Sequence, residues 1–201
     1  MGGGYRFTGD NIFASTPGGL MGLGIRLVPQ ARTYSLFSTF VQDEISLSDK
    51  LSLTAGSKFE HNAFTGFEYE LSARLAWTLT DSSTLWTAAS RAARQPSRME
   101  TALNLQYPAT PIAPGFAIAE EELGSPHLQA ETVLDYEAGY RRMISDRVSF
   151  DIATFYSLYD HLQSLGVTAP GLAATPTGII LNLPIVYQNG RQARDYGPKE
   201  L

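Results

Sequence analysis

Cysteine is absent from the 201 residues of this sequence. The chain therefore has no disulfide framework and no thiolate ligand for a metal ion. The three histidines, His61, His127 and His161, are scattered along the chain and lack the spacing of metal ligands. Neither a metal site nor any other cofactor site is predicted.

Long apolar runs are also missing, since no stretch reaches the roughly 18 to 20 residues that a membrane-spanning helix needs. Met1–Arg6 lacks the charged start and the apolar core of a signal peptide. No basic run stands out and the formal net charge is -5, which argues against a nucleic-acid partner. The mean hydropathy of -0.11 suits a soluble globule. It suits a membrane barrel equally well, because barrel strands bury apolar residues only at alternate positions.

What the sequence does contain is alternation of apolar and polar residues, the pattern of a half-exposed β-strand. The clearest segments are Leu51–Asn62, Glu70–Thr80, Thr132–Ile144 and Val148–Leu162. Thr33–Leu47 and Thr84–Ala92 are further strand candidates, and strand-like pieces at both chain ends bring the predicted number to seven or eight. No segment combines an apolar stripe with helix caps, so no helix is predicted.

The predicted connections alternate in length. Short polar turns lie at Ser48–Lys50, Asp81–Ser83 and Ser145–Arg147, whereas longer connections follow Phe7, Asn62, Arg91 and Leu162. All long connections fall at the same end of the strands, which is typical of an outer-membrane barrel with short turns on one rim and long loops on the other. A soluble antiparallel sandwich or propeller is the alternative, because period-two alternation is compatible with both.

The face opposite the apolar one is charged along most strands. In a large barrel this face would line a wet lumen, because burying a lone charge is very costly. A hairpin centred on Asp146 would set an arginine directly opposite an aspartate on this face. The lumen-facing candidates are Lys58, Glu60, Arg74, Arg91, Asp135, Glu137, Arg141 and Asp151, the last two being that pair.

On the apolar face, Trp77 and Tyr140 fall a few residues before tight turns, at the height of an interfacial aromatic girdle. Two positions leave the register open. Asp43 faces the apolar side unless a bulge near Gln42 redirects it. A two-residue turn at Asp81–Ser82 would place Trp86 beside Trp77 on the apolar face and the Arg91 candidate on the charged face.

No constellation supports catalysis. Glu120–Glu122 is a run of carboxylates in a predicted loop, where adjacent acids point in divergent directions and cannot act as an oriented acid–base pair. No glycine-rich phosphate loop lies between a strand and a helix. The sequence therefore predicts no enzyme and no catalytic residues.

An ordered set of segments resembles the barrel of TonB-dependent outer-membrane receptors. The set is Phe40–Ile45 (FVQDEI), Ser90–Ser97 (SRAARQPS), Gly124–Glu131 (GSPHLQAE) with Glu137–Tyr140 (EAGY), and Phe155–Asp160 (FYSLYD). The resemblance covers the chain from about Thr33 to its end. The sequence departs from the family at Gln95, where a small residue is usual, and at His127, where Asp or Asn is usual.

The resemblance implies an all-β fold, an antiparallel transmembrane β-barrel segment of about seven to eight strands from a barrel of about 22. Residues 1–201 would be a partial barrel domain without a plug domain, and in isolation an open curved sheet. The implied role is the wall and extracellular loops of a receptor in the bacterial outer membrane that takes up a scarce ligand, most often an iron–siderophore complex. The implied partners are outer-membrane lipid, the ligand, and a plug domain and TonB that act through parts outside this sequence.

Overall fold

The computed structural model describes residues 1–12 and 24–199, and these residues form a single sheet of thirteen strands with one short helix. The elements are β1 (Gly2–Asn11), β2 (Gly24–Leu27), β3 (Ala31–Ser48), β4 (Leu51–Asn62), β5 (Gly66–Thr80), β6 (Ser83–Arg94), α1 (Arg98–Ala102), β7 (Leu103–Gln106), β8 (Thr110–Ala113), β9 (Phe116–Leu123), β10 (Glu131–Ser145), β11 (Val148–Val167), β12 (Gly171–Thr175) and β13 (Gly178–Lys199). The all-β prediction is confirmed, although the strands outnumber the predicted seven or eight.

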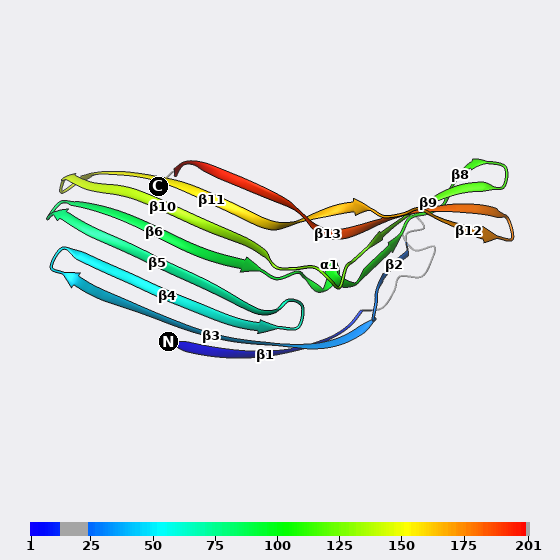
Figure 1. Cartoon of the computed structure of the whole chain (residues 1–201), viewed down its shortest axis with the longest axis horizontal. Helices are drawn as coiled ribbons and strands as arrows, with labels where there is room; N and C mark the ends of the chain where they lie inside the picture. The colour runs from blue at the N-terminus through cyan, green and yellow to red at the C-terminus, as the bar shows by residue number, and fades with distance from the viewer. Residues whose placement is uncertain (13–23, 200–201) are drawn as a thin grey trace.

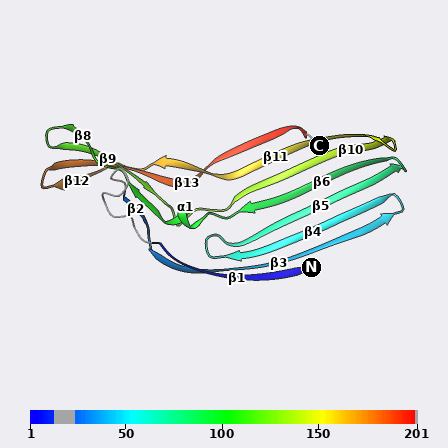
Figure 2. The ribbon, with the colours of Figure 1, turned by 180° about the vertical axis from the view of Figure 1, so that it is seen from behind.

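The sheet has two parts, which Figures 1 and 2 show from opposite sides. Eight long strands lie side by side in the order β1-β3-β4-β5-β6-β10-β11-β13. We call the first seven of these strands, together with residues 193–199 of β13, the wall. The remaining strands, helix α1 and residues 178–187 of β13 form what we call the extension, which projects from the end of the wall opposite the tight turns. Every strand pair is antiparallel except β9 with β13, which is parallel.

The three tight turns lie where the sequence predicts them and share one local chemistry. The hydroxyl groups of Ser48, Thr80 and Ser145 each accept a hydrogen bond from the backbone N–H two residues further on, at 3.3, 3.4 and 3.4 Å. Such hydroxyl-stabilised turns are a known use of Ser and Thr between strands. All three lie at the same end of the wall, at the left of Figure 1.

Each tight turn is preceded by a one-residue bulge that was not predicted from the sequence. The extra residues are Leu47, Leu79 and Ile144. Because the side-chain period of a strand is two, a one-residue shift exchanges the two faces of everything beyond it. The turn at Asp81–Ser82 was predicted correctly, but the bulge at Leu79 makes Trp77 pair with Leu85 instead of Trp86.

The predicted positions of Trp86 and Asp43 are resolved by these registers. Trp86 pairs with Ala76 and lies on the charged face, so its predicted place beside Trp77 is wrong. No bulge occurs near Gln42, since β3 pairs with β4 without interruption from Leu36 to Ser46. Asp43 therefore stays on the apolar face, opposite Ala55.

Several segments predicted as loops belong to the sheet. The predicted connection at Asn62–Tyr69 is only a short turn, in which the Asn62 side chain accepts the Phe64 and Thr65 N–H groups at 2.9 and 2.8 Å. Segment 93–130 contains a helix and three strands, and segment 166–184 contains β12 and the start of β13. Part of the loop predicted after Phe7, residues 13–23, lies outside the described residues.

Helix α1 was not predicted, although the sequence carries its start signal. Ser97 caps Glu100 N–H at 3.2 Å, and the Glu100 side chain reaches back to the Ser97 N–H. This reciprocal capping box is the Ser-x-x-Glu pattern at positions 97–100. The helix holds the small apolar core of the molecule, where Ala102 and Leu103 are buried against Leu27.

The wall is one layer thick, so its apolar face stays uncovered. Leu71, Trp77 and Ile152 are about half exposed, at 49, 49 and 53%. In water such a surface would associate, because soluble monomers rarely expose large contiguous apolar patches. The sheet is also open, with β1 at one edge and the C-terminal half of β13 at the other (Figure 1).

Candidate functional site

The charged face of the wall gathers seven of the eight predicted site residues. The strand registers align Lys58 with Glu70 and place Arg74, Ala88 and Glu137 in one continuous row. Lys58, Glu60, Arg74, Asp135, Glu137, Arg141 and Asp151 therefore share one face. That this face lines a lumen stays a prediction, because the strand registers define a shared face and not what lies against it.

Most of these charges are paired across neighbouring strands. Lys58 Nζ lies 3.3 Å from both Glu60 Oε2 and Glu70 Oε1. Lys199 pairs with Glu137, and the Ser157 hydroxyl donates to Asp135. The face is therefore locally neutralised rather than strongly positive or negative.

Trp86 and Arg74 form a contact between an aromatic ring and a cation on this face. The guanidinium carbon of Arg74 lies 4.5 Å from the centre of the Trp86 ring. The indole covers the backbone of Gly139, where an added Cβ would meet it at 2.5 Å. Gly139 is thus the position on β10 that leaves room for the Trp86 ring. This contact was not predicted, because the bulge at Leu79 shifts the strand register and could not be identified in the sequence.

Arg141 and Asp151 lie directly opposite each other, as the turn at Asp146 predicted. Their side chains form an ion pair at 2.5 Å, with Arg141 67% and Asp151 17% exposed.

A double-mutant cycle with Arg141→Gln and Asp151→Asn should give a coupling energy of about 0.2 to 1 kcal/mol, since cross-strand pairs near water contribute little. The free energy of unfolding, measured with and without 1 M salt, checks this, because salt screens an exposed pair. A coupling energy of zero at low salt would contradict the pairing.

Arg91 is separated from the other seven site residues. It pairs with Leu134 on the apolar face, near the end of the wall that carries the extension. Pairing of β5 with β6 stops at Ser72 and Ser90, and the Arg91 side chain bridges the strands beyond that point. It donates to the Tyr69 carbonyl, lies 4.2 Å over the Tyr69 ring and reaches Glu68 at 3.9 Å.

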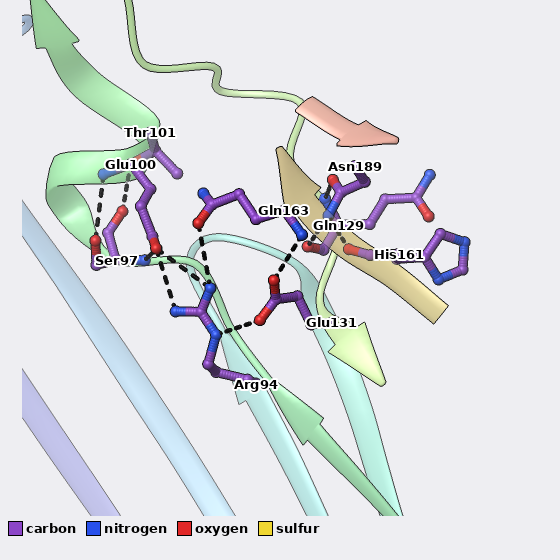
Figure 3. A network of polar contacts seen from close by, with 9 residues as sticks. All are labelled: Arg94, Ser97, Glu100, Thr101, Gln129, Glu131, His161, Gln163 and Asn189. Carbon is purple, nitrogen blue, oxygen red and sulfur yellow. Dashed lines mark hydrogen bonds and ion pairs between the residues drawn. The ribbon is translucent and has the colours of Figure 1, made fainter. Parts of the chain in front are cut away.

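A second polar cluster, shown in Figure 3, joins the wall to the extension. Arg94 contacts Glu131 through Nε, Glu100 at 3.2 Å through both terminal nitrogens, and Gln163 at 3.3 Å. Glu131 also accepts the Gln163 N–H at 2.6 Å. One arginine thereby connects β6, α1, β10 and β11. We call Arg94, Glu100, Glu131 and Gln163 the junction cluster.

Asn189 extends this junction to β13. Its side chain accepts the Gln129 N–H at 2.7 Å and donates to the carbonyls of Gln129 and His161. His161 has a positive φ of 55°, which breaks the regular pairing of β11 with β13. The Asn189 amide therefore supplies a partner to backbone that the irregularity leaves unpaired. The cluster was not predicted, because most of its partners lie outside the predicted strands, Arg94 and Glu100 in the segment before Glu131 and Asn189 in the segment after Gly166.

The extension carries the Glu120–Glu122 run, which forms part of strand β9 and not a loop. Glu121 accepts from Asn104 at 2.7 Å and from Gln106 at 3.3 Å, whereas Glu122 accepts from Tyr107 at 3.5 Å. Adjacent residues of a strand point to opposite faces of the sheet. The side chains of these acids therefore diverge as predicted, but because they lie in a strand and not in a loop. A hydrogen bond to Glu122, together with burial, raises the pKa of Tyr187 in the extension to about 12.

Within residues 1–12 and 24–199, no cluster of His, Cys, Asp or Glu is arranged to hold a metal ion. Over the same ranges, no helix has the length and apolar character needed to cross a membrane. What this part of the chain does offer is one sheet with an apolar face and a charged face.

The model of a protein family matches nearly the whole chain. The family is described as TonB dependent receptor-like, beta-barrel, and the match covers residues 1–197. The chain belongs to this family of TonB-dependent receptor barrels. The resemblance seen in the sequence is thereby confirmed, and so is the membrane-barrel fold class over the soluble sandwich or propeller. The family is one of receptors and transporters located in the outer membrane.

Solved receptor structures show the same fold. The siderophore receptor PirA of Acinetobacter baumannii has a TM-score of 0.69 at 17% identity, with 84% of this chain and 25% of that chain covered. A mutant of the ferric enterobactin receptor PfeA of Pseudomonas aeruginosa has a TM-score of 0.67 at 22% identity, covering 84% and 24%. The hemophore receptor HasR of Serratia marcescens, in complex with its hemophore HasA and heme, has a TM-score of 0.62 at 14% identity, covering 96% and 37%.

These receptors are much longer than the present barrel segment. The chain spans about a quarter of the length of the first two and somewhat more of the third. At identities below 25% the likeness concerns the fold alone. No curated protein matches the sequence.

Proposed function

We propose that this chain forms one sector of the wall and outer loops of a TonB-dependent receptor in the bacterial outer membrane. The receptor would take up a scarce ligand, an iron–siderophore complex, with energy supplied through TonB. The family match over residues 1–197 carries the proposal. The ligand class rests on the solved receptors with this fold, which are named as siderophore, ferric enterobactin and hemophore receptors.

The two faces of the wall support this division of labour. Leu71, Trp77 and Ile152 suit contact with lipid chains, whereas the paired charges of the opposite face suit a wet interior. We infer that a plug domain lies against the charged face and exchanges hydrogen bonds with it. The open edges support further strands beyond β1 and β13, because an unpaired strand edge in lipid leaves each backbone group unsatisfied at several kcal/mol.

The extension supports a role in ligand capture. It projects from the rim opposite the tight turns, where long loops of such barrels face the exterior. The junction cluster ties it to three wall strands, which would hold it upright at the entrance. Catalysis plays no part in this proposal.

Uptake in living cells tests the function. The receptor that contains this segment would be produced in a bacterium lacking its own siderophore receptors, grown on ferric siderophores or heme as the only iron source. Growth on at least one ligand is expected in cells with TonB and not in cells without it. A variant with residues 169–177 replaced by a short Gly-Ser link should bind that ligand more weakly, because the β12 hairpin belongs to the extension.

The matched control places the same link at the opposite rim, in the tight turn at Asp146–Arg147. This variant should keep its affinity for the ligand, since that rim would face the periplasm. Ligand-dependent growth that is equal in the presence and absence of TonB would contradict the proposal.

A further inference from the structure

The charged face of the wall continues into one side of the extension. Arg94 lies opposite Glu131, on the face that carries the paired charges, and it binds the side chain of Gln163. Gln163 lies opposite Asn189 of β13. Tyr187 is two residues from Asn189 and therefore points to the same side of the sheet. We call this side the inner side of the extension, since it continues the face that would line the interior.

The inner side of the extension is apolar apart from two carboxylates. The strand registers set Ile179, Leu181, Leu183 and Ile185 of β13 beside Phe116, Ile118, Glu120 and Glu122 of β9, in that order. From Tyr107 to Ala119, and from Leu165 to Gly190, the sequence contains no charged residue. The charges that the described strands of the extension carry on this side are therefore negative.

The two arginines in the described part of the extension are engaged away from the inner side. Arg26 lies opposite Asn104 and donates to its side chain at 3.1 Å. Asn104 is the neighbour of Leu105, which lies beside Glu122, so Asn104 and Arg26 point to the other side of the sheet. Arg98 is buried and bound to Asp10.

An open cavity of about 520 Å³ lies beside the β8–β9 hairpin, at the end of the extension far from the wall (Figure 1). Its walls are Tyr107, Pro108, Thr110, Ile112, Ile118 and Glu120. The volume falls in the range of about 300 to 1,000 Å³ that is usual for small-molecule sites. Ile112 is 56% exposed, so it still has apolar surface to bury against a ligand. The cavity thus combines apolar walls with one carboxylate.

This distribution of charge disfavours an anionic ligand. A negatively charged molecule at the inner side would be repelled by Glu120 and Glu122 and would lose hydration without gaining a cation. Ferric chelates differ in this respect. A hydroxamate group brings one negative charge to ferric iron, so three of them neutralise it, whereas a catecholate group brings two and leaves the complex anionic.

We propose that the extension selects ferric hydroxamate complexes, which carry no net negative charge, over anionic catecholate complexes. The apolar flank of the ligand packs on Ile112 and Ile118, and Glu120 accepts hydrogen bonds from N–H groups of the ligand while it repels anions. The inference rests on the proposed uptake function and deepens it by naming the class of ligand.

Binding of two ferric complexes to the same receptor tests the selection. The receptor that contains this segment would be purified in detergent and titrated with a ferric trihydroxamate and with a ferric tricatecholate, both carrying radioactive iron. The wild type should bind the hydroxamate more tightly. Glu120→Arg should strengthen catecholate binding about tenfold, the order expected for one charge at short range in a wet site, and change hydroxamate binding much less. The hydroxamate titration also shows that this variant is folded.

Ile112→Asn tests the apolar contact in the same titrations. This variant should weaken hydroxamate binding about tenfold, the loss expected when contact with one apolar side chain is removed. Val148→Asn is its control, because Val148 is exposed to a similar extent, at 52%, but lies beside a tight turn at the opposite rim. Asp146→Arg repeats the charge change of Glu120→Arg in that turn. Both controls should leave the binding of both complexes unchanged.

The possible failures are distinguishable. Tighter binding of the catecholate by the wild type, unchanged catecholate binding in Glu120→Arg, or an equal gain in Asp146→Arg would each overturn the charge selection and leave the uptake function standing. Equal hydroxamate binding by wild type and Ile112→Asn would overturn the apolar contact at the cavity. A receptor that binds neither complex would overturn the proposed uptake of iron–siderophore complexes, and this inference with it.

Discussion

Replacing Leu75 with arginine should destabilise the barrel that contains this segment by about 2 to 4 kcal/mol, the cost of a cation on the lipid face near the midplane. Leu75 lies between Leu53 and Thr87 on the apolar face. It is five residues from the end of β5 at Thr80, which corresponds to about 13 Å of height and so to about half of the apolar band. Unfolding titrations of the refolded receptor in lipid vesicles would measure the change.

Ala76→Arg is the control for this experiment. Ala76 is the next residue on the same strand, at nearly the same depth, but it pairs with Ser52 and Trp86 on the charged face. Arg74 already occupies that face beside Trp86, so another arginine there would meet water and polar groups. Its cost should be much smaller than that of Leu75→Arg. Equal costs at the two positions would mean that the faces do not differ in environment, and the barrel interpretation would fail.

The wall could be predicted from the sequence because its strands and turns are specified by residues that are close together in the chain. Alternation along β4, β5, β10 and β11 identifies strands and faces, and the three Ser- or Thr-initiated turns fix which strands are neighbours. A connection centred on Asp146 was enough to set Arg141 opposite Asp151. The one-residue bulge and the two-residue turn that the structure contains there give the same strand register. Seven of the eight site residues accordingly share one face.

The two register errors have one physical cause. A bulge inserts a residue without changing the composition of the strand, so Leu79 looks like any other outward leucine. The shift that it introduces moves Trp86 to the charged face and Arg91 to the apolar face. Only the cross-strand partners, which come from elsewhere in the chain, reveal such a shift.

The extension was hidden for another reason. Its strands are short, and its parallel pair joins β9 to β13, segments separated by more than fifty residues. Pro111, Pro114 and Pro184 lie in or beside these strands, where proline usually signals a loop or a sheet edge. Long-range pairing therefore overrides local signals that favour irregular structure. Only the Ser97–Glu100 capping box could have been identified in advance.

Removing Arg98 should release the extension from the wall. Arg98 is only 8% exposed, and its Nε donates to both Asp10 carboxylate oxygens, at 3.1 and 3.3 Å. Its Nη2 donates to the carbonyls of Pro29 and Gln30. Arg98→Ala leaves Asp10 and these carbonyls without the cation, and breaking a buried pair from one side costs about 3 to 5 kcal/mol.

Amide hydrogen exchange would detect this release, because local opening reports the stability of the segment that opens. Exchange should accelerate in residues 24–30 and 98–105 and stay unchanged in β4 and β10, which Arg98 does not contact. Met99→Ala, at the neighbouring and 54% exposed position of the same helix, should leave all of these rates unchanged. Slow exchange of residues 24–30 in Arg98→Ala would show that the junction cluster around Arg94 holds the extension without Arg98. The buried pair with Asp10 would then be a consequence of the packing around α1 and not its support.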